Sequence, residues 1–200
     1  ILAALLKRSK TKKGALVQVS LLDSAVDMQF EVLTTYFNDG GKLPTRASVR
    51  GSGHSYLSAP YGMYETKDGF IALAMGDLVK IATCLGLDPQ DYQDRNTWFT
   101  NRDQILGTLS QTLRNQTTNT WVNQLRNEGI WCSEVSDYEA FLNSEGFQES
   151  GMLQRVKLVS GEELQTTRSV YLIDGKRLYS GKPAPYVGQD NEQVRKDYLS

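Results

Sequence analysis

The sequence predicts a mixed α+β / α/β fold, and three patterns carry that prediction. Apolar residues recur at three- and four-residue steps in several stretches, as they do in amphipathic helices. Short runs of alternating apolar and polar residues flank Thr66-Lys-Asp-Gly69, which is typical of a β-hairpin. Further alternating runs follow residue 151. With 5 prolines and 10% aromatic residues in 200, the composition excludes disordered and collagen-like chains.

The first 59 residues are predicted as two helices joined by a turn, followed by an irregular segment. Residues 1–8 have the pattern of a helix end, and a polar connection runs to Gly14. Apolar residues from 17 to 37 repeat at helical spacing, which predicts one helix of about five turns ended by Asn38-Asp-Gly-Gly41. Residues 42–59, rich in Gly, Ser and Pro, are predicted as a linker or an active-site loop.

Residues 61 to about 145 are predicted as a compact α+β unit. The hairpin pairs residues 61–65 with 70–74, because Asp-Gly supplies the positive φ of a tight turn. Asp77 is expected to cap a helix that Gly86 stops. Further elements are expected in this order: helices at 102–114 and 117–127, an extended segment at 132–135, and a helix at 137–143 capped by Ser136.

After residue 151 the sequence predicts strands and a final helix. The strands are expected at 152–159, 168–173 and 176–179, and Asp174-Gly175 marks the turn between the last two. Pro183-Ala-Pro185 then breaks the chain before a helix from about residue 191 to 199.

Charge and cysteine content exclude several classes of partner and site. A net charge of −1 gives no basic field for nucleic acid, and no apolar stretch reaches the ~18–20 residues that span a membrane. Cys84 and Cys132 permit at most one disulfide, and no CxxC or Cys/His cluster predicts a metal site. We therefore expect a protein of the reducing cytoplasm. The five cations within residues 7–13 are expected to be a solvated turn or helix end, or else a phosphate contact.

Taken from the residues alone, the chemistry is sparse. The single histidine lies in Arg50-Gly-Ser-Gly-His-Ser55, where a polar loop role competes with a catalytic one. No strand–turn–helix frame makes a nucleophile of the neighbouring serines, and no spacing singles out an acid/base pair among the carboxylates. Trp121 and Trp131 are expected in the core. No catalytic residue is therefore assigned within this chain.

Four stretches, in order along the chain, resemble the C-terminal half of the class III CoA-transferases of the CaiB/BaiF type. They are residues 4–8 with 14–25 (GALVQVSLLDSA), residues 59–74 (APYGMYETKDGFIALA), residues 102–135, and residues 183–192 (PAPYVGQDNE). The sequence departs from the family pattern at Lys13, at Trp131-Cys132 where a proline is more usual, and at Asp190 in place of a histidine. The resemblance covers essentially the whole chain.

The resemblance implies a Rossmann-like large domain and a smaller domain in an interlocked homodimer. On that plan residues 1–55 belong to the large domain, residues 56–148 form the small α+β domain, and residues 149–200 return to the large domain. Surface from the rest of the enzyme is then missing around the opening helix.

The resemblance also implies an enzyme that moves CoA between an acyl-CoA and a carboxylate acceptor without a further cofactor. An aspartate upstream of this chain attacks the thioester and forms a mixed anhydride, so this C-terminal fragment alone is expected to be inactive. Family members that transfer formyl or oxalyl groups carry a glycine-rich loop before the hairpin, which closes over the acyl intermediate. Residues 50–54 occupy the corresponding place here but lack the glycine run. Gly51, Gly53 and His54 are expected to line the acyl end of the site, with Tyr61 behind them.

Two alternatives stay open at this point. The chain is also compatible with a fragment of a related α-methylacyl-CoA racemase, which uses an Asp/His pair to remove the proton next to the thioester carbonyl. The second alternative is a non-catalytic module that binds CoA esters. The residues of this chain do not distinguish the three functions. The transferase and the racemase would place their decisive residues upstream, whereas the non-catalytic module would have no upstream half.

Overall fold

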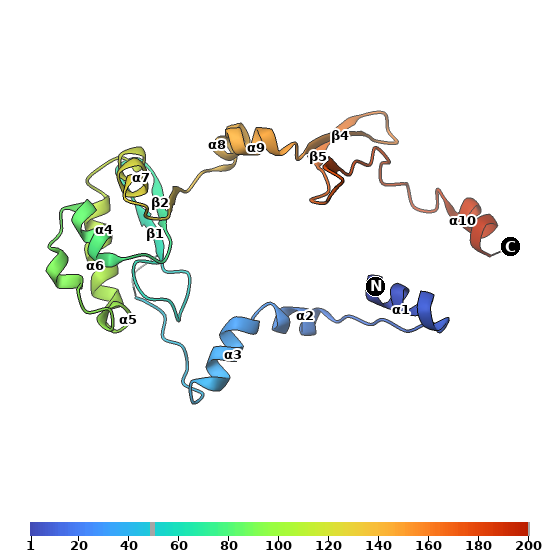
Figure 1. Ribbon diagram of the computed structural model, residues 1–200. Helices are drawn as coiled ribbons and strands as arrows, with labels where there is room; N and C mark the ends of the chain where they lie inside the picture. Colours follow the sequence, from blue (N-terminus) through green and yellow to red (C-terminus); the bar gives the residue numbers. More distant parts are fainter. Residues whose placement is uncertain (49–50, 200) are drawn as a thin grey trace. The chain divides into compact units, whose positions relative to one another are not determined.

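The computed structural model describes residues 1–48 and 51–199, and the chain divides into two compact units (Figure 1). The first unit is Ile1–Val135 and the second is Ser136–Ser200. Each unit contains both helices and strands, so the predicted mixed class is confirmed. The division into residues 1–55, 56–148 and 149–200 stays a prediction.

The first unit begins with three helices and continues as a mixture of strands and helices. Its elements are α1 (Leu2–Thr11), α2 (Leu21–Asp27), α3 (Phe30–Asn38), β1 (Gly62–Glu65), β2 (Phe70–Leu73), α4 (Leu78–Leu85), the 3₁₀ helix η1 (Pro89–Tyr92), α5 (Thr97–Thr100), α6 (Arg102–Leu113), α7 (Thr118–Asn127) and β3 (Cys132–Glu134).

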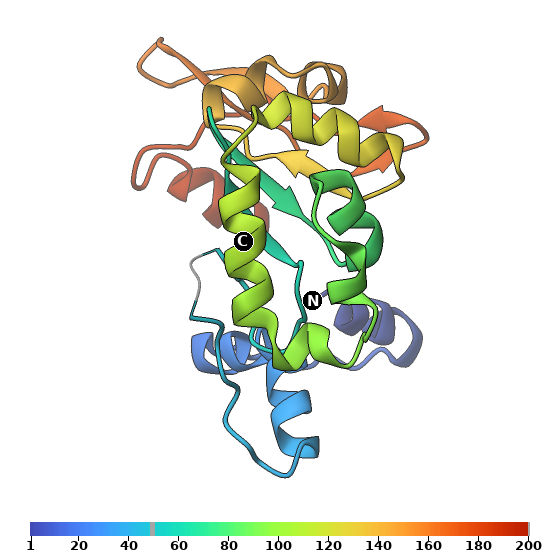
Figure 2. The ribbon, with the colours of Figure 1, turned by 90° about the vertical axis from the view of Figure 1, so that its left-hand side faces the viewer.

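Strands β1, β2 and β3 form an antiparallel sheet in that order, and the predicted hairpin is confirmed. The predicted turn geometry is wrong, because neither Asp68 nor Gly69 has a positive φ. Helices α4, α6 and α7 gather around this sheet (Figures 1 and 2). Alternate strand residues such as Tyr64 and Ile71 are buried, and they pack in one core with helix residues such as Leu78, Leu109 and Leu125. The sheet therefore has one face built into a core, as its period of two predicts.

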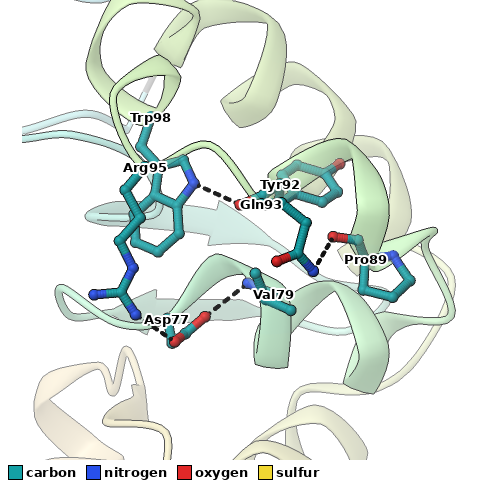
Figure 3. A network of polar contacts seen from close by, with 7 residues as sticks. All are labelled: Asp77, Val79, Pro89, Tyr92, Gln93, Arg95 and Trp98. Carbon is teal, nitrogen blue, oxygen red and sulfur yellow. Dashed lines mark hydrogen bonds and ion pairs between the residues drawn. The ribbon is translucent and has the colours of Figure 1, made fainter.

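Local signals fix the ends of α4 as the sequence predicts. Asp77 Oδ1 accepts a hydrogen bond from the Val79 amide at 2.9 Å, and Gly86 ends the helix with a φ of 72°. Figure 3 shows that Arg95 donates to the other oxygen of Asp77 at 3.1 Å, while the Trp98 indole donates to the Tyr92 carbonyl at 2.9 Å. This network joins the start of α4 to the chain that leads into α5.

The turn of the hairpin holds the start of α7. Asp68 Oδ1 accepts from the amide of Thr118 at 2.7 Å and from its hydroxyl at 3.0 Å. These bonds hold the pKa of Asp68 below its usual range, because they favour the ionised carboxylate. Thr66, which is buried, shares a hydroxyl contact of 2.6 Å with Thr118. Asp68 is thus a structural residue that joins two elements of the core.

The prediction of one helix over residues 17–37 is wrong, because the structure has two. Helix α2 begins only at Leu21, where Ser20 Oγ accepts the Asp23 amide at 3.0 Å. Gln29, with φ −99° and ψ 13°, then separates α2 from α3. Within the described residues 1–48, none of α1, α2 and α3 buries a residue, so no packing surface holds the apolar stripe in one straight helix.

The second unit consists of α8 (Tyr138–Asn143), α9 (Glu145–Ser150), β4 (Leu153–Lys157), β5 (Glu163–Thr167), β6 (Leu172–Ile173), β7 (Lys176–Arg177) and α10 (Asn191–Tyr198). Asp137, not Ser136, caps α8 by accepting the Ala140 amide at 2.8 Å. The sequence reading missed α9 and β5, and the strands predicted at 168–173 and 176–179 shrink to the short pair β6 and β7. Four of the five residues of β5 are polar and none is buried, so no apolar alternation marks this strand in the sequence.

Candidate functional site

A groove of about 530 Å³ lies beside the β1-β2-β3 sheet and brings together three of the predicted site residues. It combines glycines from the segment before the hairpin with residues of all three strands. Its lining residues are Gly51, Gly53, Tyr61, Gly62, Met63, Ala72, Leu73, Ala74, Trp131, Cys132 and Ser133.

Gly51 packs its backbone directly against β1. Its φ is +98°, and a Cβ at this position would lie 2.1 Å from the carbonyl oxygen of Met63. The Gly51 carbonyl accepts the Met63 amide at 3.0 Å, which fixes the segment at the edge of the strand. Around Gly53, by contrast, no atom of the described residues lies within 4 Å of an added Cβ. Only the first of these glycines is required by geometry.

Tyr61 and His54 have different surroundings. Tyr61 is half-buried and lines the groove, and its amide donates to the Ser58 carbonyl at 3.3 Å. His54 Nδ1 accepts the Tyr56 amide at 3.2 Å, so its other nitrogen, Nε2, carries the proton of the neutral ring. Nε2 lies 3.5 Å from a carboxylate oxygen of Glu31. The structure therefore places His54 between Tyr56 and α3, whereas Tyr61 lies in the groove.

Sequence reasoning missed several residues of the groove. Trp131 was expected in the core together with Trp121, but Trp121 is buried and Trp131 is 79% exposed. The Trp131 carbonyl accepts the Ala74 amide at 3.0 Å, which fixes its backbone at the end of the sheet and leaves its ring outside. Met63, on β1, is half-exposed and also lines the groove. The exposure of Met63 could have been predicted, because alternate residues of a strand face opposite sides and its neighbour Tyr64 is buried. The position of Trp131 depends on the register of β3 against β2, which the sequence alone does not give.

The groove is apolar and electrically neutral. None of the described residues that line it carries a charged side chain. Burial raises the pKa of the Cys132 thiol, and nearby Arg126 offsets this only in part. The thiol therefore stays protonated at neutral pH and is not a nucleophile in this state. Such a groove can bind an apolar group and can contact it with glycine backbone, but it supplies no acid, base or nucleophile of its own.

Residues 1–48 and 51–199 contain no group of His, Cys, Asp and Glu that could hold a metal ion, and both cysteines are free thiols there. The five cations of residues 7–13 are exposed on α1 and just beyond it. Among the described helices, none has both the length and the hydropathy to cross a membrane.

A family model and two curated proteins that match this chain all concern CoA-transferases. The model of CoA-transferase family III matches residues 1–191. The succinyl-CoA:glutarate CoA-transferase of Homo sapiens is 22% identical over 206 residues, covering 100% of this chain and 46% of that protein. The acetyl-CoA:oxalate CoA-transferase of Acetobacter aceti is 23% identical over 208 residues, covering 100% of this chain and 51% of its own length. The chain thus spans about half the length of the curated relatives it matches.

Solved structures show the same fold. The crystal structure of Rv3272 from M. tuberculosis has a TM-score of 0.73 at 21% identity, over 96% of this chain and 50% of that one. A CaiB/BaiF family protein from Brucella suis has a TM-score of 0.69 at 20% identity, over 98% and 51% of the two chains. This chain therefore shares the fold of these two structures, as the four stretches that resemble the family predict.

Proposed function

Because the chain belongs to CoA-transferase family III, we propose that it is the C-terminal part of an enzyme that transfers CoA from an acyl-CoA to a carboxylic acid. The match of the family model to residues 1–191 is the observation that carries this proposal. The names of the curated relatives, which are CoA-transferases for glutarate and oxalate, favour transfer over the racemase and the non-catalytic module.

The proposed reaction proceeds through acyl exchange on an aspartate that lies outside this chain. The carboxylate attacks the thioester carbonyl, CoA leaves as the thiolate, and a mixed anhydride forms. The thiolate then attacks the aspartyl carbonyl, which releases the donor acid and leaves an aspartyl-CoA thioester. The acceptor carboxylate repeats the two steps in reverse and departs as the new acyl-CoA. In successive steps a carboxylate oxygen displaces the thiolate and the thiolate displaces a carboxylate at an acyl carbon, so the reaction involves no change of oxidation state.

In this proposal the present chain forms one wall of the site. Gly51, Gly53, His54 and Tyr61 are proposed for the acyl end, and the apolar groove lined by Gly51, Gly53 and Tyr61 supports that placement. A neutral, partly dehydrated wall suits an anhydride, because it keeps water from a carbonyl that water would hydrolyse. His54 contacts Tyr56 and Glu31, so its proposed role is to shape the backbone next to Gly53.

The proposed enzyme is an interlocked homodimer. Support comes from the large apolar side chains of the first helices, of which Leu2 is 82%, Leu21 92% and Met28 89% exposed. Exposed apolar surface on this scale marks an interface. The mass of the full-length protein in solution, measured by light scattering, should be that of two chains.

The function is tested by incubating the full-length protein with an acyl-CoA and a set of carboxylic acids. The expected product is a new acyl-CoA, identified by mass spectrometry. Hydroxylamine added during turnover should convert the activated aspartate to a hydroxamate located upstream of this chain. The 200-residue chain alone should form no new acyl-CoA.

Two results would contradict the proposal. One is turnover by the isolated chain, since this chain supplies no nucleophile in our account. The other is epimerisation of a 2-methylacyl-CoA by the full-length protein with no CoA exchange, which would establish the racemase instead.

A further inference from the structure

Two adjacent residues at the start of α6 reach the segment that carries the candidate glycines. The Arg102 side chain is buried, with 6% of the residue exposed. Its Nη1 donates to the carbonyl of Ser55 at 2.6 Å, and its Nη2 donates to the carbonyl of Thr45. One guanidinium thus binds the backbone on both sides of Gly51 and Gly53. The planar fork of arginine suits this task, because it directs several N–H groups in fixed directions.

Asp103 holds a third point of the same segment. Its carboxylate accepts the Ser48 amide at 3.1 and 3.2 Å and the Ser48 hydroxyl at 2.7 Å. These hydrogen bonds hold the pKa of Asp103 below its usual range. Ser48 stands three residues before Gly51, so the contact lies close to the groove.

The base of this arrangement is rigid. Helix α6 is anchored in the core through Leu106 and Leu109, which are 3% and 0% exposed. The Arg102 guanidinium also lies over the Phe99 ring at 4.7 Å from its centre. On the other side of the segment, the Met63 amide donates to the Gly51 carbonyl. The backbone near the groove is therefore fixed to α6 at three points and to β1 at a fourth.

The hydrogen bonds of Arg102 go to loop backbone. Its guanidinium loses hydration on burial, donates to the neutral carbonyls of Ser55 and Thr45, and is attracted electrostatically by the Asp103 carboxylate. Arg95 offers a contrast in the same unit, since it is mostly exposed, pairs with Asp77 at 3.1 Å and lies over Trp98 at 5.4 Å. Arg102 holds a loop backbone, whereas Arg95 adds to a helix cap.

We propose that Arg102 and Asp103 are positioning residues that fix the backbone of Gly51 and Gly53 at the groove, and that CoA transfer requires this geometry. The second half of the proposal rests on the function proposed above. Neither residue lines the groove, whereas both line a separate cavity of about 610 Å³ together with Ser55. Their proposed effect on the groove therefore passes through the backbone of the glycine segment.

The first half is tested by hydrogen exchange in the full-length protein. The variants are Arg102→Lys, which keeps the charge but replaces the fork, and Asp103→Asn. We expect the backbone amides of residues 51–56 and of Met63 to exchange about tenfold faster or more. The exchange rates of the amides in α4 and α7 should stay the same. Arg95→Lys is the matched control and should leave residues 51–56 unchanged. If Arg102→Lys does not fold, Asp103→Asn and Ser48→Ala carry the test, since Ser48 is exposed.

The second half is tested by the kinetics of the same variants. We expect kcat to fall about tenfold, with the KM for acyl-CoA and the thermal midpoint nearly unchanged, because the chemistry loses alignment while the fold persists. Unchanged exchange at residues 51–56, or equally faster exchange throughout the unit, would overturn the positioning role. Faster local exchange with unchanged kcat would overturn its link to transfer. Absence of CoA transfer in the unmodified enzyme would refute the proposed function, while the exchange result would still decide the positioning role.

Discussion

Residues 59–135 and residues 1–44 both contain amphipathic helices, but their side chains have very different surroundings. Helix α4 buries Leu78, Ile81, Ala82 and Leu85. In residues 1–44, which the structure describes in full, α1, α2 and α3 bury no residue. The helices of the first region face a sheet and one another, whereas the opening helices face no apolar partner surface of that kind. An apolar stripe thus indicates a helix but does not tell what covers it.

This contrast agrees with the proposed place of the chain in a larger enzyme. Residues 59–135 contain the hairpin, the three helices that cover it and a continuous core. The apolar side chains of that core are therefore buried without surface from another part of the enzyme. The opening helices require a covering surface, which in our proposal comes from the rest of the enzyme and its partner subunit. Paired substitutions, one in each region, test whether the two regions differ in this way.

The largest difference is expected for removal of an apolar side chain. Leu109→Ala, at a residue with 0% exposure in α6, should lower the free energy of unfolding by about 2–5 kcal/mol, because it leaves a cavity. Leu21→Ala, at a residue 92% exposed in α2, should change it by less than ~0.5 kcal/mol in the 200-residue chain. Urea unfolding followed by tryptophan fluorescence measures both. Equal losses would show that α2 already has a packing partner within this chain.

The next effect concerns the two glycines between the regions. Gly51→Ala forces a side chain onto a φ of +98° and against the Met63 carbonyl, so we expect a loss of about 1–3 kcal/mol. Gly53→Ala meets no described atom within 4 Å and should be nearly neutral. Thermal unfolding of the two variants gives the comparison. A neutral Gly51→Ala would mean that the segment does not lie against β1.

A smaller effect is expected at two helix caps. Asp77→Ala removes the acceptor for the Val79 amide at the start of α4 and should cost about 1 kcal/mol. Ser20→Ala removes the equivalent bond to the Asp23 amide at the start of α2. Because α2 adds nothing to the core, that loss should appear as reduced helicity in circular dichroism, with no change in the unfolding midpoint. A lowered midpoint for Ser20→Ala would link α2 to the core after all.

The smallest effect is a dependence on pH within the hairpin region. Hydrogen bonds from Thr118 lower the pKa of Asp68 in the folded state. Asp68 therefore stabilises the fold above the usual carboxyl pKa of about 3.9, and this stabilisation is lost as the pH falls through the lower folded value. Asp68→Asn should flatten the decline of stability in that range. An unaltered pH profile in the variant would show that other carboxylates account for the decline.

The sequence predicts most elements that carry their own local signal. Asp77 and Gly86 mark both ends of α4, and Asp68-Gly69 marks the hairpin turn, because caps and turns depend on adjacent residues. The break at Gln29 was not predictable from periodicity, since the apolar spacing continues through it. Strand β5 was not predictable either, because it has a single apolar residue and therefore no alternation of apolar and polar side chains.

The candidate site was predictable only in part. The resemblance to the family pointed to Gly51 and Gly53, and both line the groove. The other wall, with Trp131 and Cys132, depends on the pairing of β3 with β2, which joins residues about 60 positions apart. The hydrogen bonds of Arg102 to Thr45 and Ser55 likewise join residues far apart in the sequence, so no local sequence pattern predicts them. His54 was a candidate as the single histidine of the sequence, but it is not among the residues that line the groove.

The most direct test of the account is hydrogen exchange of the amides of α1, α2 and α3, measured in the 200-residue chain and in the full-length protein. We expect rapid exchange in the isolated chain and strong protection in the full-length protein, while the amides of α4 and α6 are protected in both. The difference would show that the exposed apolar faces of residues 1–44 are covered by the rest of a larger enzyme. Equal exchange of these helices in the two proteins would contradict the account.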